Sequence, residues 1–263
     1  PVIYLGGSVS GLGTFNIDST QFVVQGTMVV SAPATLRGAT ITGPGHITFT
    51  GTVRLASTTF SALGGTRFDT DAEVTSENAA IFVTAALENA GTVLGTVYTT
   101  VYLDGAGSML RNLPGGLIDA AAGMTVTTQS VAGSAENAGD WRFAGASNSS
   151  IAVPLVSSGS SRITVVGASR QLTISRGSMN TGTMTMDGDG LVIFMGLVPH
   201  VFDAPVPFGG TGRIDFDWPS TFTFQQNSTI TNPSIMWSGL LTGTGTVTLE
   251  GVNTRASGGL VIA

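Results

Sequence analysis

One short segment recurs along the chain, and it constrains the fold more than any other feature. Its copies read Leu-Glu-Asn-Ala-Gly at 87–91, Leu-Arg-Asn at 110–112 and Ala-Glu-Asn-Ala-Gly at 135–139. The asparagines follow one another after 23 and 25 residues, a repeat length typical of stacked repeat proteins. A unit of this size cannot cover its own apolar side chains, so each copy must lie flat against the next.

Asparagine and glycine at the same place in each copy indicate a corner, because glycine adopts positive φ freely and asparagine tolerates it. An alternative is that Asn-Ala-Gly is a hairpin turn in an ordinary β-sandwich.

A second pattern, Gly-x-Gly-x-apolar-x-apolar, favours stacking, because its apolar residues point to one side of a strand. No helical pattern follows it, which argues against phosphate-binding loops. The Gly-x-Gly pattern occurs at 11–17, 43–49, 188–194, 210–216 and 243–249.

The strands between these corners are short, whereas a sandwich usually has longer ones. Asn180 and Asn232 continue the asparagine spacing at about two coil lengths each, so coil length varies. Variable coils favour a right-handed parallel β-helix over the left-handed form, which keeps a strict hexapeptide repeat. Dividing 263 residues by about 24 predicts an all-β solenoid (β-solenoid) of roughly eleven coils. We expect a single domain, residues 1–263, that is a segment of a longer protein.

Two segments depart from the repeat. Pro199, Pro205 and Pro207 cannot donate to a sheet ladder, so they predict a protruding loop over 198–208. The last residues, Leu-Val-Ile-Ala at 260–263, resemble a strand of a continuing array.

Composition narrows the classes of function. The chain has no Lys and no Cys, which excludes lysine Schiff bases, thiol chemistry, disulfides and cysteine zinc sites. A net charge of −6 and a pI near 4.7 argue against nucleic acid and anionic membranes as partners. The longest apolar run, 191–198, is far short of a membrane helix, so we expect no membrane insertion.

Few residues suggest chemistry, and each has a simpler structural explanation. His46 and His200 lie in no motif for metal binding or acyl transfer. Carboxylates on alternate residues can hold Ca²⁺ or act as acid and base on a sugar, although like charges also keep an exposed strand soluble. Such clusters are Asp69, Asp71 and Glu73; Asp187 and Asp189; and Asp215 and Asp217.

Three further groups of residues keep other functions open. Arg170 and Arg176 can bind a uronate, as in polysaccharide lyases that share the parallel β-helix. Exposed tryptophans can stack on sugars, and the candidates are Trp141, Trp218 and Trp237. Threonines spaced by two share one strand face, and in register they would form a flat array like that of ice-binding solenoids. Such pairs occur at 40 and 42, 48 and 50, 125 and 127, 183 and 185, 221 and 223, 229 and 231, and along 242–248.

Two stretches carry a resemblance to a known class of proteins. Leu-Glu-Asn-Ala-Gly-Thr-Val at 87–93 and Leu-Thr-Gly-Thr-Gly-Thr-Val-Thr-Leu at 241–249 resemble the repeats of bacterial β-solenoid surface proteins, the autotransporter passengers and filamentous adhesins. The resemblance implies a secreted or surface-displayed rod used for adhesion, spacing or fibre building. It carries over no catalytic residue.

We therefore expect a non-enzymatic structural or adhesive β-solenoid, extracellular or at the cell surface, that forms or decorates a fibre. No cofactor, metal ligand or catalytic residue is assigned. Its expected partners are its own copies, other surface proteins or glycans, and not nucleic acid. A polysaccharide-active β-helix, lyase or hydrolase, and an ice-binding solenoid are the alternatives. Whether Asp69, Asp71 and Glu73, or Asp187 and Asp189, bind Ca²⁺ stays open at this point.

Overall fold

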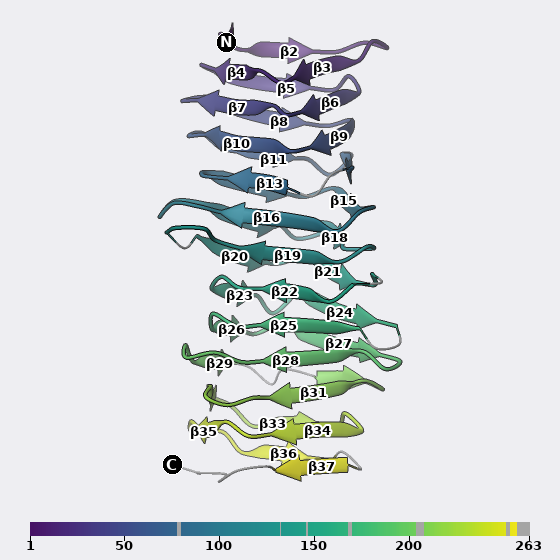
Figure 1. The fold of residues 1–263 in the computed structure, drawn as a ribbon, viewed down its shortest axis with the longest axis vertical. Helices are drawn as coiled ribbons and strands as arrows, with labels where there is room; N and C mark the ends of the chain where they lie inside the picture. Colours follow the sequence, from purple (N-terminus) through teal and green to yellow (C-terminus); the bar gives the residue numbers. More distant parts are fainter. Residues whose placement is uncertain are drawn as a thin grey trace.

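The chain forms one tall stack of β-strand coils (Figure 1). The computed structural model describes residues 1–77, 80–131, 133–145, 147–167, 170–203, 208–250 and 253–256. All 37 strands in these ranges belong to three parallel sheets, and the same ranges contain no helix. The all-β solenoid predicted from the repeats is confirmed.

Each coil visits the three sheets in turn. The first sheet contains β1 (Val2–Tyr4), β4 (Gln21–Val24), β7 (Thr40–Gly43), β10 (Thr58–Ala62), β13 (Ala80–Val83), β16 (Thr99–Leu103), β19 (Met124–Thr127), β22 (Ser149–Ile151), β25 (Gln171–Ile174), β28 (Leu191–Phe194), β31 (Arg213–Phe216), β34 (Ser234–Trp237) and β37 (Asn253–Ala256). The second contains β2 (Gly7–Val9), β5 (Thr27–Val30), β8 (His46–Phe49), β11 (Thr66–Phe68), β14 (Ala86–Asn89), β17 (Met109–Asn112), β20 (Ser134–Asn137), β23 (Leu155–Ser157), β26 (Ser178–Asn180), β29 (His200–Phe202), β32 (Thr221–Phe224) and β35 (Leu240–Thr242). The third contains β3 (Phe15–Asp18), β6 (Ala34–Arg37), β9 (Thr52–Ala56), β12 (Glu73–Ser76), β15 (Thr92–Gly95), β18 (Leu117–Asp119), β21 (Asp140–Phe143), β24 (Arg162–Val166), β27 (Thr183–Asp187), β30 (Phe208–Gly210), β33 (Ser228–Ile230) and β36 (Val247–Leu249). Rungs are numbered below by the strands of the second sheet, from β2, the first, to β35, the twelfth.

The coils differ in length, as expected. Phe22 pairs with Ile41 after 19 residues, whereas Leu110 pairs with Ala135 after 25. In the described ranges the second sheet has twelve rungs and so eleven turns between its ends, in agreement with the roughly eleven coils expected. In Figure 1 strands such as β16 and β19 run leftward in front and the second sheet runs rightward behind as the chain descends, so the coil is right-handed.

The interior is filled by the side chains that alternate inward along each strand. Phe22, Ile41 and Phe60 stack rung on rung in the first sheet, and each is at most 4% exposed. Towards the C-terminal end the interior becomes aromatic, with the ring centroid of Phe216 lying 5.7 Å from that of Phe194 and 4.4 Å from that of Trp237. Each coil therefore buries its apolar side chains against those of the neighbouring coils, as a repeat of this size requires.

The recurring asparagines form a buried column on the inner side of the second sheet. Asn89, Asn112 and Asn137 lie on successive rungs and are each 1% exposed. Asn89 Nδ2 donates to Asn112 Oδ1 at 2.9 Å, and Asn112 Nδ2 donates to Asn137 Oδ1 at 2.9 Å. Ser157 and Asn180 occupy the next two rungs. The column links the buried amides of neighbouring coils, although Asn89 Oδ1 and Asn180 Oδ1 have no partner among the described residues.

Asn232 does not belong to this column, contrary to the spacing argument. It follows β33 of the third sheet, and its Nδ2 donates to the carbonyls of Gly209 and Gly212. The sequence spacing was misleading because Asn180 and Asn232 lie at different corners of the coil, although both are fully buried.

The asparagines do not turn the corner by adopting positive φ, as the repeat suggested. Among the described residues other than glycine, positive φ occurs only at Ser19 and Ser57. Gly91 and Gly139 are needed for close approach instead, because a Cβ on either would collide with carbonyl oxygens of the preceding coil. The repeat therefore marks a buried hydrogen-bonded column beside a tight contact between coils.

The connection before β29 leaves the stack at Pro199, but a loop over all of 198–208 is wrong, because His200–Phe202 forms β29 of the second sheet. Leu197 is 86% exposed and Val198 is 47% exposed, and Pro199 beside them is exposed as well. Pro205 and Pro207, and the strand expected at 260–263, lie outside the described residues. A helix long and apolar enough to cross a membrane is not found in the described ranges.

Candidate functional site

The outer face of the second sheet has a pattern that follows the rungs. Because the strands pair in register and side chains alternate, one outward residue per rung falls on a single line. We call this line the outer column. From the second rung to the twelfth it contains Val29, Thr48, Arg67, Glu88, Arg111, Glu136, Val156, Met179, Val201, Thr223 and Thr242.

The fourth to seventh rungs form a charge ladder of Arg67, Glu88, Arg111 and Glu136, whose signs alternate. Arg111 Nε donates to Glu136 Oε2 at 2.9 Å, and Arg111 Nη1 lies 3.4 Å from Glu88 Oε1. Arg67 pairs with Asp69 at 3.0 Å. The ladder side chains are between 23% and 41% exposed, so each pair contributes less than about 1 kcal/mol to stability. The ladder is therefore a surface pattern more than a source of stability.

The eighth to tenth rungs continue the outer column without a charge. Val156 is 43% exposed, Met179 is 49% exposed, and Val201 follows on the next rung. The exposed Leu197 and Val198 extend this surface, because the Val198 side chain lies over Gly177 on the rung before. We call Val156, Met179, Leu197, Val198 and Val201 the apolar strip. Contiguous exposed apolar surface of this kind marks interaction sites.

A groove of about 340 Å³ lies on the outer face of the third sheet. Charged residues of both signs line it, namely Asp140, Arg142, Arg162 and Asp187. Arg142 Nη1 also pairs with Asp119 at 3.1 Å. Of these four, only Asp187 belongs to an acidic cluster in the sequence, because the other three are isolated charges there. The signal that would have found them is the pairing of Asp140 with Arg162 on neighbouring coils.

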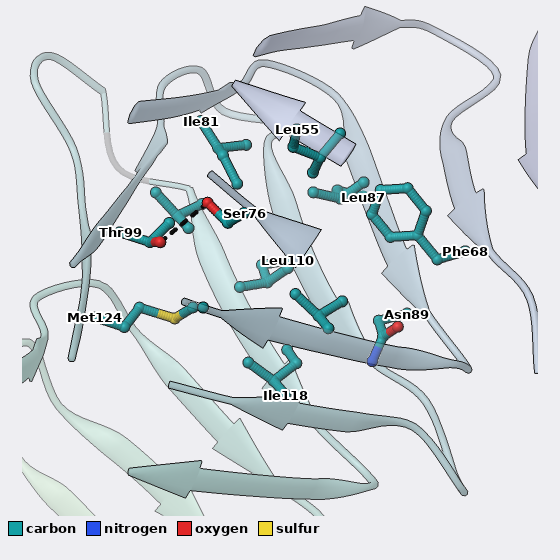
Figure 2. A pocket seen from close by; sticks show the side chains of 13 residues that line it. Leu55, Phe68, Ser76, Ile81, Leu87, Asn89, Thr99, Leu110, Ile118 and Met124 are labelled. Carbon is teal, nitrogen blue, oxygen red and sulfur yellow. Dashed lines mark hydrogen bonds between the residues drawn. The ribbon is translucent and has the colours of Figure 1, made fainter. Parts of the chain in front are cut away.

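A cavity of about 30 Å³ lies inside the core, where Phe68 gives way to Asn89 in the inner column (Figure 2). Apolar side chains such as Leu110 line it, and Thr99 Oγ1 donates to Ser76 Oγ at 3.1 Å beside it. The space holds no more than one water or methyl group. It is a packing defect and not a ligand site.

Both histidines have structural partners. His200 is fully buried, with Nδ1 2.9 Å from Ser178 Oγ and Nε2 3.2 Å from the Met195 carbonyl oxygen. Burial lowers the pKa of His200 from 6.5 to about 4, against a smaller opposite effect of the Met195 hydrogen bond. His46 is hydrogen-bonded through both ring nitrogens. The two imidazoles lie on the third and tenth rungs and do not form a common site.

The acidic clusters are tied to other neighbours. Asp69 pairs with Arg67, and Asp215 accepts hydrogen bonds from Arg213 at 2.6 and 2.7 Å. Asp217 accepts from a backbone amide and a serine hydroxyl. In the part of the chain that the structure describes, no three His, Asp or Glu side chains converge to hold a metal ion. Of the remaining members, Asp71, Glu73 and Asp189 are exposed, and Asp187 lines the groove.

The residues considered for sugar binding are not brought together. Trp141 and Trp237 are 1% and 3% exposed and pack in the core, whereas Trp218 is 67% exposed. Neither Arg170 nor Arg176 lines the groove of the third sheet. The prediction of an aromatic platform built from all three tryptophans is therefore wrong.

The threonine pairs are divided among the three sheets. The longest regular run is on the first sheet, where Ile193 and Asp215 end a line of four hydroxyl residues, Thr100, Thr125, Ser150 and Thr173. Tyr102 stands beside Thr100 on the same strand. The described residues therefore do not form the uninterrupted flat threonine face that the ice-binding interpretation needs.

Two surfaces stand out as candidate sites. The charge ladder and the apolar strip occupy seven successive rungs of the second sheet, and the groove gathers four charged residues on the third. Comparison with protein-family models, with curated proteins and with solved structures finds no match to this chain, so both surfaces are interpreted from their geometry.

Proposed function

We propose that this chain is a non-enzymatic structural β-solenoid, a stiff rod at the cell surface or outside the cell, which assembles with its own copies through the outer face of the second sheet. The apolar strip carries the proposal. Met179, which is 49% exposed, and Leu197, which is 86% exposed, lie in one patch on the side of the rod. Monomeric proteins rarely leave contiguous apolar surface of this kind uncovered.

The architecture supports a structural role. The described strands pair with the next coil along all three sheets, so backbone hydrogen bonds run the length of the rod. In such a stack each repeat contacts only its neighbours, and the stack presents long, regular lateral faces. The resemblance to bacterial surface proteins is supported as far as this repeat fold, and the adhesin-like role and the location are part of the proposal.

A second copy is favoured over other partners by the charge ladder. Arg67, Glu88, Arg111 and Glu136 provide two positive and two negative charges in alternation. A surface that pairs with itself must carry both members of each opposite-charge contact. A face designed for an acidic glycan would instead carry a single sign of charge.

Sedimentation of the purified chain over a range of concentrations tests the proposal. Met179→Glu places a charge in the middle of the apolar strip, so we expect association to weaken by about tenfold or more. The matched control is Thr223→Glu, in the same outer column two rungs further on, and it should leave association unchanged. A wild-type chain that sediments as a lone rod at every concentration would overturn the proposal.

The groove on the third sheet favours a second candidate function, the binding or cleavage of a polysaccharide. Asp140, Arg142, Arg162 and Asp187 offer carboxylate acceptors and guanidinium donors in one groove, which suits sugar hydroxyl and carboxylate groups. Calorimetric titration with neutral and uronate oligosaccharides tests it. Arg162→Ala should abolish binding, while Arg37→Ala, an exposed arginine of the third sheet outside the groove, should not. New reducing ends would establish an enzyme, and no heat with either sugar class would exclude this candidate.

A further inference from the structure

We infer that two copies pair face to face on the second sheet as antiparallel rods, with a two-fold axis that runs along the strands midway between Glu88 and Arg111. The inference rests on the proposed function and deepens it by naming the partner surface and its register. A rotation about this axis reverses the rod but preserves position along the strand. Each outer column therefore faces the other, with the fifth rung against the sixth and the fourth against the seventh.

The charge ladder is self-complementary in this register. Glu88 faces Arg111 of the second copy, and Arg67 faces Glu136 of the second copy. The two-fold repeats both contacts, so four rungs of each copy meet an opposite charge. A pattern of plus, minus, plus and minus matches itself when it is turned end for end, and this is the reason that alternation matters.

The apolar residues also meet one another. Val29 on the second rung, 37% exposed, faces Met179 on the ninth, 49% exposed. Thr48 on the third rung brings its methyl group to Val156 on the eighth. At the corner between the first and second sheets, Leu63 beside the fourth rung is 81% exposed, and Val131 beside the seventh is 55% exposed. Each of these residues on one half of the face thus has a counterpart on the other half.

The corner connections fit in the same register. Those that precede the second to fifth rungs have two or three residues, and those that precede the sixth to ninth have three to six. The longest follow β16 and β19, at the left of Figure 1. Under the two-fold a shorter connection always faces a longer one. The facing pairs are 84–85 with 104–108, 63–65 with 128–133, 44–45 with 152–154, and 25–26 with 175–177.

Other arrangements lose these contacts. Sliding one copy by one rung places Glu88 against Glu88 or Arg111 against Arg111, and like charges across an interface disfavour association. Parallel rods related by a two-fold along the rod would turn the outer column towards the neighbouring outward line, which contains Met109 and Ser134. The four ladder charges would then face no charge. The pattern therefore selects one direction and one register.

The facing area is sufficient for a specific but modest association. Eight rungs at about 4.8 Å each, with four-residue strands of about 13 Å, give roughly 500 Å² of flat face per copy, to which the corner loops add. Standard specific interfaces bury about 800 Å² on each partner. We therefore expect pairing in the micromolar range, which sedimentation can follow.

Charge reversal tests the register directly. Glu88→Arg places two arginines face to face, and Arg111→Glu places two glutamates face to face, so each variant alone should associate about tenfold more weakly than the wild type or worse. Mixed in equal amounts, the two variants restore opposite charges at all four contacts, so association should return. Arg54→Glu, the same charge change at the Arg54–Glu77 pair of the third sheet, is the matched control and should have no effect.

The outcomes separate this inference from the proposed function. If the wild type associates and Met179→Glu weakens it, but the single charge reversals associate as well as the wild type or the mixture does not recover, the register is wrong while lateral assembly stands. Circular dichroism of each variant confirms that the fold is retained. If the wild type does not associate at all, both proposals fail.

Cross-linking supplies an independent test in a chain that has no cysteine of its own. With Thr48→Cys and Val156→Cys together, a short bismaleimide should join two copies, because the third and eighth rungs face each other across the interface. Within one copy these rungs are about 24 Å apart, beyond the reach of the linker. Thr48→Cys with Thr223→Cys, on the third and eleventh rungs, is the control. Equal cross-linking of the control would overturn the register.

Discussion

The fold holds His200 in its neutral form, between Ser178 and the Met195 carbonyl. Burial lowers its pKa to about 4, whereas an unfolded histidine titrates near 6.5. Between these values the unfolded chain binds a proton that the folded chain does not, so this contribution to stability is complete above about pH 6.5 and is lost as the pH falls towards 4. It amounts to about 3 kcal/mol at most. Urea denaturation should give a lower free energy of unfolding at pH 4.5 than at pH 7.5. His200→Phe should reduce the difference between these two free energies. An unchanged difference would mean that another group dominates acid sensitivity.

Asn112 is the middle member of the buried asparagine column, bonded to Asn89 on one side and to Asn137 on the other. Asn112→Ala removes the donor to the buried Asn137 Oδ1 and one of the three acceptors of Asn89 Nδ2, so we expect a loss of about 2 kcal/mol in the free energy of unfolding. Asn148→Ala, at an exposed asparagine, should change it by less than about 0.5 kcal/mol. Urea denaturation compares the two. Equal effects would show that the column contributes no more than a surface residue.

At the scale of a single strand, β15 ends at Gly95, which borders the core cavity. A Cβ there would meet no atom nearer than 3.6 Å, and its φ is outside the left-handed range, so nothing requires glycine. Gly95→Ala should therefore stabilise the fold by about 0.5 kcal/mol or more, by restricting the unfolded chain and occupying part of the cavity. Gly139→Ala should destabilise it instead, because its Cβ would collide with the Gly116 carbonyl oxygen. Thermal unfolding measures both, and melting temperatures that shift in the same direction would contradict this explanation.

For the whole molecule, the sequence predicts the stack but not the surface that the stack creates. The step from Asn89 to Asn112 is visible because one residue type recurs on an inner column, where burial limits the choice of side chain. Outer positions carry no such constraint. Arg67 and Glu88 are 21 residues apart, whereas Glu88 and Arg111 are 23 apart, so their alignment appears only once the pairing is known. Burial of Trp141 could not be foreseen for the same reason, since a shift of one residue exchanges the inner and outer faces.

If the rod is a sum of equivalent coils, one whole coil can be removed without disturbing the rest. Thr42 pairs with Ser61, so deletion of residues 42–60 joins Ile41 to Ser61 with every later strand in its own sheet. We expect this variant to keep one cooperative urea transition, with an m-value reduced by about one part in eleven, the share of one coil. Deletion of residues 42–50 removes about half a coil and turns the first two coils away from their partners, so those coils should be cleaved by protease while the remainder stays folded. The two deletions differ in that only the first preserves the register of the coils. Equal protease resistance of the two variants would therefore show that the coils are not interchangeable units.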